Sequence, residues 1–560
     1  MKRKLNTFLS FMLATALAFL LLCSGETASA ASSIYVNDSQ NVLSGDISSA
    51  YAVGDTGTVS VTGGTYAITG DGVVQIGGEA STGDNVETPE APLSGTVTIK
   101  NSTVKIGLYY KTSSFDTAVS SSTLTNTNGS GFGLGYFDSS RAFVEVANVT
   151  DKQITIVPDT NTSVSGSNVY CYHIKLSQSY SSFTEAQNAA LQYTGGFPAY
   201  YSGTYYVLVG QYASAADAQA AVATSGIQGT AFSASSECTV VTSGTTNKII
   251  FEYDCGTSSS LAVTPRTTSK AITKLSNNGY TYYGSFIFDR YNGNSKLTVI
   301  SVLNVEDYVK GVIPYEMGAS WPIEALKAGA IAARNYVQAN YDKYSPYGFD
   351  IVNTASDQVY QGTRYANSTT DSACDATANM YLTYKGQLCS AFYYAANGGA
   401  SENSENVFLN PLGYCKGKAD PFEAAIDFYC KSWCKSFTTA DISSKLSAYN
   451  LSTIASITAT YTESGNVFSV TMTDINGKNA TLTRSSCMSF LSKLGFSYTS
   501  MHFTVTYDST TDTYTISGGG SGHNIGMSQW GANSMAKVYN KNYRQILGFY
   551  YTDVVISQGA

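Results

Sequence analysis

Charged residues are scarce in this chain of 560 residues, and basic runs are absent beyond its first four residues. Asp, Glu, Lys and Arg make up 13% of the sequence, and 40 acidic against 32 basic residues give a formal net charge of −8. A protein that binds a phosphate backbone normally presents clustered Lys and Arg. The composition therefore argues against nucleic acid as a partner.

Long apolar runs are also missing, except for one at the N-terminus. Residues 8–22 are almost uniformly apolar, residues 2–4 are Lys-Arg-Lys, and residues 27–30 read Thr-Ala-Ser-Ala. Small residues at positions −3 and −1 complete the pattern of a cleavable Sec-type signal peptide. We therefore expect a signal peptide over residues 1–30 and an exported protein located outside the cell or in its wall. The apolar run is short for a span of about 20 residues, and an uncleaved membrane anchor is the alternative.

Cysteines are few, and nine of the ten follow Cys23 of the predicted signal. An odd number in an oxidising compartment leaves at least one thiol without an intramolecular partner. Five of the cysteines fall within about sixty residues: Cys374, Cys389, Cys415, Cys430 and Cys434. This crowding favours local disulfides, and a metal site is the alternative.

Tyrosine and glycine are abundant, with 43 Tyr and 50 Gly. Such a composition is common in exported proteins that handle sugars, where aromatic faces stack on pyranose rings. Tyr and Thr also favour strands, so the composition alone leaves both readings open. The length predicts two to four domains, and the alternation of strand-like and helical segments predicts an α+β fold. Residues 31–160 read as a β-rich N-terminal region of short strands between Gly, Asp and Asn breaks.

Residues 165–241 have the rhythm of a small ferredoxin-like module, a β-α-β unit repeated twice. The expected strands and helices cover residues 169–176, 183–193, 205–210, 215–224 and 239–241. The run Tyr-Tyr-Val-Leu-Val-Gly-Gln-Tyr at 205–212, with Ser214, Ala218 and Ala221, resembles the SPOR (sporulation-related repeat) domain. That resemblance implies a βαββαβ module that binds glycan strands stripped of stem peptides. The alternative is a generic α/β insert.

Residues 267–556 contain no lengthy linker and read as one mixed α+β catalytic domain. A helix is expected after Ser320 and Pro322, with one apolar face at Leu326, Ala330, Ala333 and Val337. Glu316 is expected in the loop just before this helix, where a carboxylate can project from a rigid scaffold. Arg334, on a flank of the helix, could reach back toward Glu316. A capping or salt-bridging role for Glu316 is the alternative.

A second motif is Gly-His-Asn-Ile-Gly-Met-Ser-Gln-Trp-Gly-Ala at residues 522–532. Its glycines allow close approach of the backbone to a ligand. His523, Ser528 and Gln529 offer hydrogen bonds, and Trp530 offers a stacking face. A lone His is more often structural than catalytic, so this motif decides nothing by itself.

Taken together, the motifs resemble the stage II sporulation protein D family, which includes the LytB amidase enhancers. The matching pieces are Glu-Asp-Tyr-Val-Lys-Gly-Val-Ile-Pro-x-Glu-Met at 306–317, and Trp-Pro-x-Glu-Ala-Leu-Lys-Ala at 321–328 with Ala-Ala-Arg at 332–334. Asp-Gln-Val-Tyr-Gln-Gly at 357–362, Gly-Gly-x-x-Glu-Asn-Ser-Glu at 398–405 and residues 522–532 complete the set. Five motifs in the same order over about 250 residues make the resemblance specific.

The resemblance implies a peptidoglycan lytic transglycosylase that cleaves the MurNAc–GlcNAc bond of denuded strands in sporulation or cell-wall remodelling. A glycoside hydrolase normally uses two carboxylates. A lytic transglycosylase needs one, because the C6 hydroxyl of the sugar attacks C1, and that role falls to Glu316. The other matching residues become candidate substrate-binding or scaffold residues: Arg334, Gln358, Tyr360, Glu402, His523, Ser528 and Gln529. A helix N-terminus downstream and a contact with Arg334 would favour the ionised form of Glu316, so desolvation must offset them.

Some family members carry a zinc-binding His where this chain has Tyr394. No cofactor is therefore expected, and a structural zinc at Cys389, Cys415, Cys430 and Cys434 is the alternative. The implied partners are denuded glycan strands and, upstream, a cell-wall amidase. The alternative function is a non-catalytic glycan-binding modulator that stimulates another wall hydrolase.

The segment Val104 to Tyr110 resembles the opening strand of this family's domain. Residues 104–150 are therefore a candidate first part of the catalytic domain, with the SPOR-like module inserted after them. An independent N-terminal β module is the alternative, and the sequence does not choose between them.

Overall fold

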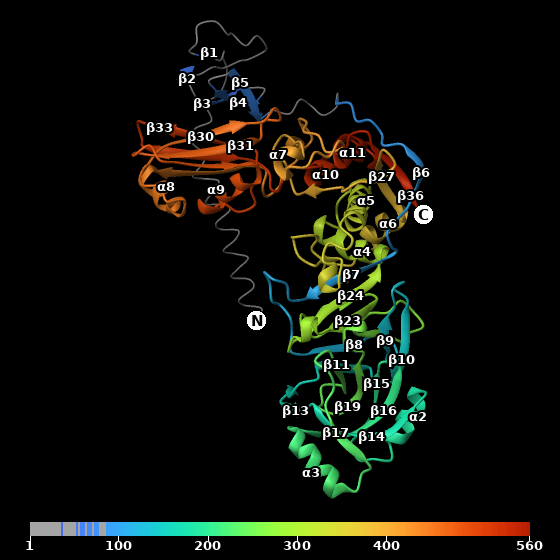
Figure 1. The fold of residues 1–560 in the computed structure, drawn as a ribbon. Coiled ribbons are helices and arrows are strands. Elements are labelled where there is room, and N and C mark those ends of the chain that lie inside the picture. The colour runs from blue at the N-terminus through green and yellow to red at the C-terminus, as the bar shows by residue number, and fades with distance from the viewer. Residues whose placement is uncertain (1–34, 37–51, 54–56, 62–63, 70–71, 78–85) are drawn as a thin grey trace, which may run out of the picture. The chain divides into compact units, whose positions relative to one another are not determined.

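The computed structural model describes residues 35–36, 52–53, 57–61, 64–69, 72–77 and 86–560 (Figure 1). The predicted signal peptide lies outside these residues. Within the described part of the chain, no helix is long and apolar enough to cross a lipid bilayer.

The chain divides into two compact units. The first unit is Ser94–Ser390 with Ile556–Ala560, and the second is Met1–Leu93 with Ala391–Val555. Both units mix helices and strands, so the predicted α+β class is confirmed. The range 267–556, expected as one catalytic domain, is shared between the two units.

A seven-stranded sheet carries the motif-bearing helices of the first unit. Its order is β10-β9-β20-β23-β24-β7-β25, formed by Phe143–Val149, Phe132–Phe137, Leu261–Pro265, Ser285–Asp289, Thr298–Asn304, Thr103–Tyr109 and Ile351–Val352. Strand β7 runs antiparallel to β24 and parallel to β25. Residues 103–109 therefore share a sheet with strands that follow the SPOR-like segment in sequence.

Three helices follow β24: α4 at Val305–Glu316, α5 at Ile323–Ala339 and α6 at Ser368–Ala376. Asn304 caps α4 by accepting a hydrogen bond from the N–H of Glu306 at 2.8 Å. Glu316 is the last residue of α4, so the loop expected at this position is wrong. Residues 305–313 form a helix with one buried face. Pro314 has no N–H, so it cannot donate a hydrogen bond to the carbonyl of residue 310. The helix ends two residues later.

A ten-stranded sheet forms the rest of the first unit, in the order β17-β14-β16-β15-β19-β18-β11-β8-β21-β22. Its strands are Gly229–Phe232, Tyr172–Tyr180, Thr204–Tyr212, Gly196–Tyr201, Ile249–Asp254, Thr239–Ser243, Gln153–Pro158, Ser122–Asn126, Thr273–Leu275 and Thr281–Tyr282. A small hairpin, β12 (Thr162–Val164) and β13 (Ser167–Val169), follows β11.

The first four strands in this order, with α2 (Phe183–Ala190) and α3 (Ala215–Ser225), form an antiparallel βαββαβ unit. This is the ferredoxin-like topology predicted from the sequence. One face of the sheet, with Ile174, Leu176, Val207 and Val209, packs against Ala186 and Ala190 of α2 and against the partly buried Ala221 and Val222 of α3. The predicted boundaries need two corrections. Strand β15 was missed, and the last strand of the unit is β17 rather than residues 239–241, which belong to β18.

The first unit also contains a four-stranded sheet, β27-β26-β36-β6, formed by Gln387–Leu388, Met380–Tyr384, Val555–Gly559 and Leu93–Val97. In the second unit, the N-terminal strands are β1 (Tyr35–Val36), β2 (Ala52–Val53), β3 (Gly57–Val61), β4 (Gly64–Thr69) and β5 (Gly72–Gly77), of which β3, β4 and β5 form a sheet.

Two three-stranded sheets and a parallel strand pair organise residues 391–555. Strands β29-β34-β33 cover Trp433–Thr438, Thr513–Gly518 and Phe503–Asp508, and β30-β31-β32 cover Ile454–Tyr461, Val467–Asp474 and Asn479–Thr483. The parallel pair is β28 (Tyr393–Tyr394) with β35 (Met527–Ser528). The helices are α7 (Glu405–Phe408), α8 (Thr439–Lys445), α9 (Cys487–Lys493), α10 (Gln529–Lys537) and α11 (Tyr543–Tyr550).

The expected local disulfides are not formed. None of the nine cysteines in the described residues is disulfide-bonded. No group of three or more cysteines in the described chain gathers at metal-binding distance either. The crowding of cysteines in the sequence therefore does not translate into a shared cluster in space.

Candidate functional site

Glu316 lies at the C-terminal end of α4, with its side chain partly exposed. The backbone N–H of Val359 donates a hydrogen bond to Oε1 of Glu316 over 3.3 Å. The carboxyl group is thus oriented by main chain from a loop 43 residues away in sequence, yet it remains accessible to solvent. A carboxyl that is both positioned and reachable can act as a general acid or base.

The backbone after Glu316 is fixed by Met317, whose side chain is buried. The N–H of Met317 donates to the carbonyl of Ile313 at 2.9 Å, which closes the last turn of α4. Gly329 of α5 makes room for the Met317 side chain, since a Cβ at position 329 would lie 2.2 Å from its sulfur. Met317 and the glycine of the following helix therefore pack directly against each other.

Gln358 and Tyr360, on either side of Val359, are both buried. Tyr308 donates to Oε1 of Gln358 at 3.1 Å, and Gln358 donates to the carbonyl of Ala333 at 3.4 Å. The ring of Tyr360 packs against Tyr308 with centroids 5.1 Å apart. With its neighbours anchored on both sides, Val359 presents its N–H to Glu316. Gln358 and Tyr360 thus act on the carboxyl through the backbone.

Arg334 is fully buried, and it pairs with Glu306 rather than with Glu316. Its Nε and Nη2 reach the two carboxylate oxygens of Glu306 at 2.8 and 2.6 Å. A bidentate pair of this kind is strong and directional. The ion pair connects the first turn of α4 to α5. Arg334 therefore stabilises the packing of α4, the helix that carries Glu316.

Tyr315, the residue before Glu316, belongs to a group of exposed aromatic side chains that the sequence analysis did not single out. Tyr315 and Tyr365 are 44% and 42% exposed, with ring centroids 5.6 Å apart. The guanidinium of Arg364 lies 5.0 Å from the Tyr365 ring and 4.6 Å from the Tyr280 ring. Only the position of Tyr315 directly before Glu316 could have pointed to this group.

Four of the predicted site residues belong to the second unit, and Glu402 is the first of them. Its side chain is buried and accepts hydrogen bonds from Asn406 at 2.9 Å, Asn466 at 3.1 Å and Thr462 at 2.5 Å. Each carboxylate oxygen therefore has partners within the fold. The arrangement is that of a buried carboxylate that ties two loops together.

His523 sits among aromatic rings of the second unit, with the centroids of Phe408 and Tyr394 5.3 and 5.4 Å from its own. Burial lowers the pKa of His523 to about 4, which keeps the imidazole neutral near pH 7. The N–H of Ile525 donates to its Nδ1 at 3.0 Å, so the proton of the neutral ring resides on Nε2.

Ser528 and Gln529, which follow in the same motif, are buried at the start of α10. Ser528 caps the helix by accepting from the N–H of Gly531 at 2.9 Å. Its hydroxyl also donates to the carboxyl group of Glu423. Both residues are placed where they organise the helix N-terminus.

Glu423 and Asp420 are buried carboxyl groups that the sequence analysis missed. Glu423 accepts from the N–H groups of Asn397 at 2.7 Å and Gly398 at 2.9 Å, and Tyr550 donates to Asp420 at 2.6 Å. Burial, together with the charge of Asp420, raises the pKa of Glu423 to about 8. Neither residue belongs to a motif that marked it, and only their contacts in the fold reveal them.

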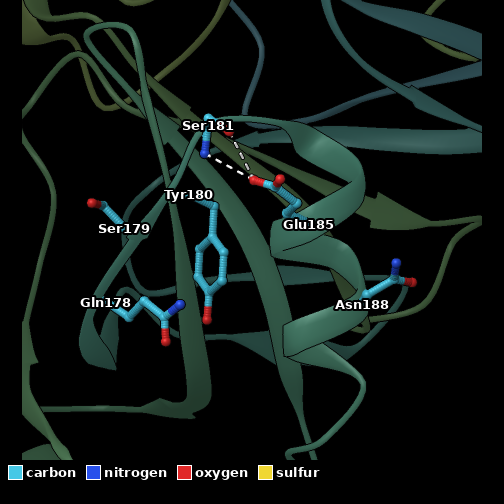
Figure 2. A pocket seen from close by; sticks show the side chains of 6 residues that line it. All are labelled: Gln178, Ser179, Tyr180, Ser181, Glu185 and Asn188. Carbon is cyan, nitrogen blue, oxygen red and sulfur yellow. Dashed lines mark hydrogen bonds between the residues drawn. The ribbon is translucent and has the colours of Figure 1, made fainter.

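Two open hollows lie in the ferredoxin-like part of the first unit. One, of about 760 Å³, is lined by Gln178, Ser179, Tyr180, Ser181, Glu185 and Asn188 at the junction of β14 and α2, where Ser181 donates twice to Glu185 (Figure 2). The other, of about 580 Å³, includes Lys175, Tyr201 and Phe232. Neither contains a predicted site residue.

The structure places Glu316, Arg334, Gln358 and Tyr360 in one unit, and Glu402, His523, Ser528 and Gln529 in the other.

Comparison with known proteins agrees with the motif pattern. Residues 293–384 match the family described as Stage II sporulation protein. An uncharacterised protein of Brachyspira hyodysenteriae is 35% identical over 285 residues, which cover 50% of this chain and 73% of the relative. The protein named Amidase enhancer in Bacillus subtilis is 32% identical over 342 residues, covering 53% of this chain and 47% of that protein.

Stage II sporulation protein D of Bacillus subtilis is 31% identical over 276 residues, which cover 46% of this chain and 76% of that protein. The family match over residues 293–384 includes the helices that carry Glu316 and Arg334. The chain therefore belongs to the stage II sporulation protein D family, which includes the amidase enhancers.

Proposed function

We propose that this protein is a peptidoglycan lytic transglycosylase with Glu316 as its single acid/base. The observation that carries the proposal is the placement of Glu316: partly exposed, at the end of a helix, and held by the N–H of Val359 at 3.3 Å. The chemistry needs one carboxyl group, because the attacking oxygen belongs to the sugar.

The reaction uses one proton that returns to its donor. The protonated carboxyl of Glu316 gives its proton to the glycosidic oxygen as the C1–O bond breaks. The C6 hydroxyl then bonds to C1, and the Glu316 carboxylate accepts the hydroxyl proton. The products are a free 4-hydroxyl on the leaving sugar and a 1,6-anhydro ring, and the enzyme is again protonated.

Glu316 is the last residue of α4, so its carboxyl group lies at the C-terminal end of a helix. The C-terminal end of a helix carries a partial negative charge, which disfavours a second negative charge beside it. Arg334, which would have favoured the carboxylate, is occupied by Glu306. The hydrogen bond from the N–H of Val359 acts in the opposite direction, because it favours the ionised carboxylate, and it also orients Oε1.

The substrate that suits these surroundings is a glycan strand without stem peptides. Tyr315 and Tyr365 offer two adjacent exposed rings for pyranose faces, and Arg364 beside them offers hydrogen bonds to sugar hydroxyls. The SPOR-like module in the same unit serves as a second glycan-binding element, with its open hollows as the contact surface. The protein acts outside the cytoplasm on strands that a wall amidase has stripped.

The decisive experiment is digestion of purified denuded glycan strands, with products read by mass spectrometry. Wild-type protein yields anhydro-sugar ends, and Glu316→Gln yields none while still sedimenting with denuded sacculi. Glu463→Gln makes the same change at an exposed position of the second unit and keeps wild-type turnover. Near-parental turnover by Glu316→Gln refutes the assignment of Glu316, and reducing ends indicate a hydrolase instead.

A second candidate function is supported by one specific similarity, that to the protein named Amidase enhancer. In that case the protein binds glycan and stimulates a partner amidase without cleaving the strand. The same experiment separates the two functions. Absence of any glycan product from the wild-type protein, together with faster amidase action on intact sacculi, favours the modulator.

A further inference from the structure

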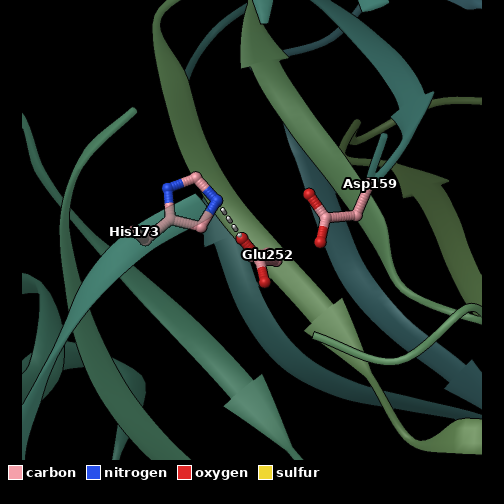
Figure 3. Close-up of side chains that lie close together, drawn as sticks. All are labelled: Asp159, His173 and Glu252. Carbon is pink, nitrogen blue, oxygen red and sulfur yellow. Dashed lines mark ion pairs between the residues drawn. The ribbon is translucent and has the colours of Figure 1, made fainter. Parts of the chain in front are cut away.

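Three side chains from distant parts of the sequence converge in the interior of the first unit (Figure 3). Asp159 follows the end of β11, His173 lies on β14, and Glu252 lies on β19. His173 and Glu252 are 0% exposed and Asp159 is 8% exposed. One potential ligand atom of each lies within 4.8 Å of the other two.

The protein leaves these three ligand atoms without hydrogen-bond partners. Oδ1 of Asp159, Nε2 of His173 and Oε2 of Glu252 are all buried and unsatisfied. Buried polar atoms are nearly always paired, because leaving one unpaired costs roughly 1–3 kcal/mol. Three orphaned atoms on side chains that converge at this distance indicate a missing common partner rather than three separate defects.

Two other atoms of the cluster, Nδ1 of His173 and Oε1 of Glu252, have partners outside it. Nδ1 of His173 lies 2.8 Å from the carbonyl of Gly210, so it must carry the ring proton. Nε2 is then an acceptor, facing Oε2 of Glu252 at 3.4 Å. Tyr201 donates to the other oxygen, Oε1, at 2.6 Å. A carbonyl that fixes the tautomer of a histidine is the usual outer partner of a metal-binding imidazole.

From these contacts we propose that Asp159, His173 and Glu252 form a binding site for one divalent zinc ion. Zinc binds imidazole nitrogen and carboxylate oxygen at about 2.0–2.2 Å. At a tetrahedral angle such distances separate two donors by about 3.4 Å, which matches the spacing of Nε2 and Oε2. An imidazole among the donors disfavours Mg²⁺ and Ca²⁺, which take all-oxygen sites.

The site has a structural role in the fold. It joins β14 of the ferredoxin-like module to β19 and to the turn after β11, which leads into the β12–β13 hairpin. Burial of these three polar side chains without a common partner is unfavourable. A bound cation converts this unfavourable buried arrangement into a cross-link between strands.

The test uses the full mature chain, purified without chelators, with metal content measured by elemental analysis. We expect one zinc per chain, a melting temperature that falls by several degrees after EDTA treatment, and recovery with Zn²⁺. Cobalt(II) added to the stripped protein should give the visible absorption of a four-coordinate site. These wild-type readouts do not depend on the folding of any variant or on glycan cleavage.

Matched variants locate the ion. Asp159→Asn, His173→Gln and Glu252→Gln should each weaken zinc binding at least about 100-fold, whereas His502→Gln, which alters a buried histidine of the second unit, should not. Absence of zinc and of a Zn²⁺-dependent melting shift in the wild type overturns the proposal and leaves a shared proton as the partner of the triad. Loss of zinc from His502→Gln places the ion elsewhere and also overturns it.

Discussion

The sulfur of Met317 lies 2.2 Å from the point where a Cβ on residue 329 would stand. A side chain at position 329 would therefore have to displace the sulfur of Met317, the residue that follows Glu316. Met317 is 1% exposed, so its side chain is enclosed by the fold. This relationship connects the helix core to the geometry of the proposed acid/base.

Gly329→Ala should lower the free energy of unfolding by about 1 kcal/mol and glycan cleavage about 10- to 100-fold. The overlap with Met317 costs about 1–3 kcal/mol, and the better helix propensity of alanine returns about 0.5–1 kcal/mol. The activity falls because a displaced Met317 moves the neighbouring carboxyl, and small misplacements are costly in catalysis. Denaturant unfolding and single-turnover assays measure the two effects.

The control for this prediction is the same substitution in a Met317→Ala background. With the sulfur removed, Gly329→Ala should stabilise the protein by a few tenths to 1 kcal/mol, because only the helix propensity remains. A destabilisation of the same size in both backgrounds would show that the close contact with Met317 does not determine the effect.

The sequence predicted the parts of the fold that have strong periodic signals. The ferredoxin-like unit was recognisable because its Ala-rich segments have a helical pattern and the apolar run at 205–212 has the pattern of a strand. Strand β15 was missed because Gly196–Tyr201 is buried along most of its length and contains Pro198, so it shows no alternation. Helix α4 was not predicted, because residues 305–316 were considered only as a motif and Glu316 was expected in a loop.

The sequence predicted only those site residues that belong to a recognisable motif. The motifs indicated Glu316, Arg334 and Glu402, but they could not show that Arg334 pairs with Glu306, since that contact depends on how two helices cross. The cluster of Asp159, His173 and Glu252 was also invisible, because its members lie on different strands and no local spacing connects them. Such contacts arise from sheet order, which the sequence alone does not fix.

Glu306→Gln tests whether Arg334 is a scaffold residue. The substitution leaves a fully buried guanidinium without its counter-charge, which should cost about 2–4 kcal/mol of unfolding free energy. Asp427→Asn breaks an exposed ion pair with Lys431 and should cost about 0.5 kcal/mol or less. If Glu306→Gln is as mild as Asp427→Asn but abolishes cleavage, the pair acts on the substrate rather than on the fold.

Tyr365→Ala should raise KM for denuded strands several-fold and leave kcat within about twofold. Removing an exposed ring that stacks on a sugar costs about 1 kcal/mol of binding, and the ring does not touch the proton-transfer atoms. Tyr365→Phe should retain wild-type KM, because the face of the ring is unchanged. Tyr498→Ala removes a ring that is 69% exposed in the second unit and should change neither constant. An unchanged KM in Tyr365→Ala would exclude this ring from the substrate path.

His502 should make the stability of the second unit fall as the solution is acidified. Both ring nitrogens of His502 are buried without hydrogen-bond partners in the structure, and burial lowers its pKa from 6.5 to about 4. Between these values the unfolded chain binds more protons than the folded one, so stability is intact above pH 6.5 and declines as the pH falls toward 4. The loss amounts to about 2 kcal/mol at pH 5, on the scale of about 1.4 kcal/mol per pKa unit.

His502→Leu removes the titrating group, so denaturant unfolding at pH 7 and pH 5 should show a smaller difference in the variant than in the wild type. Equal pH dependence in both proteins would mean that His502 is already protonated, or solvated, in the folded state.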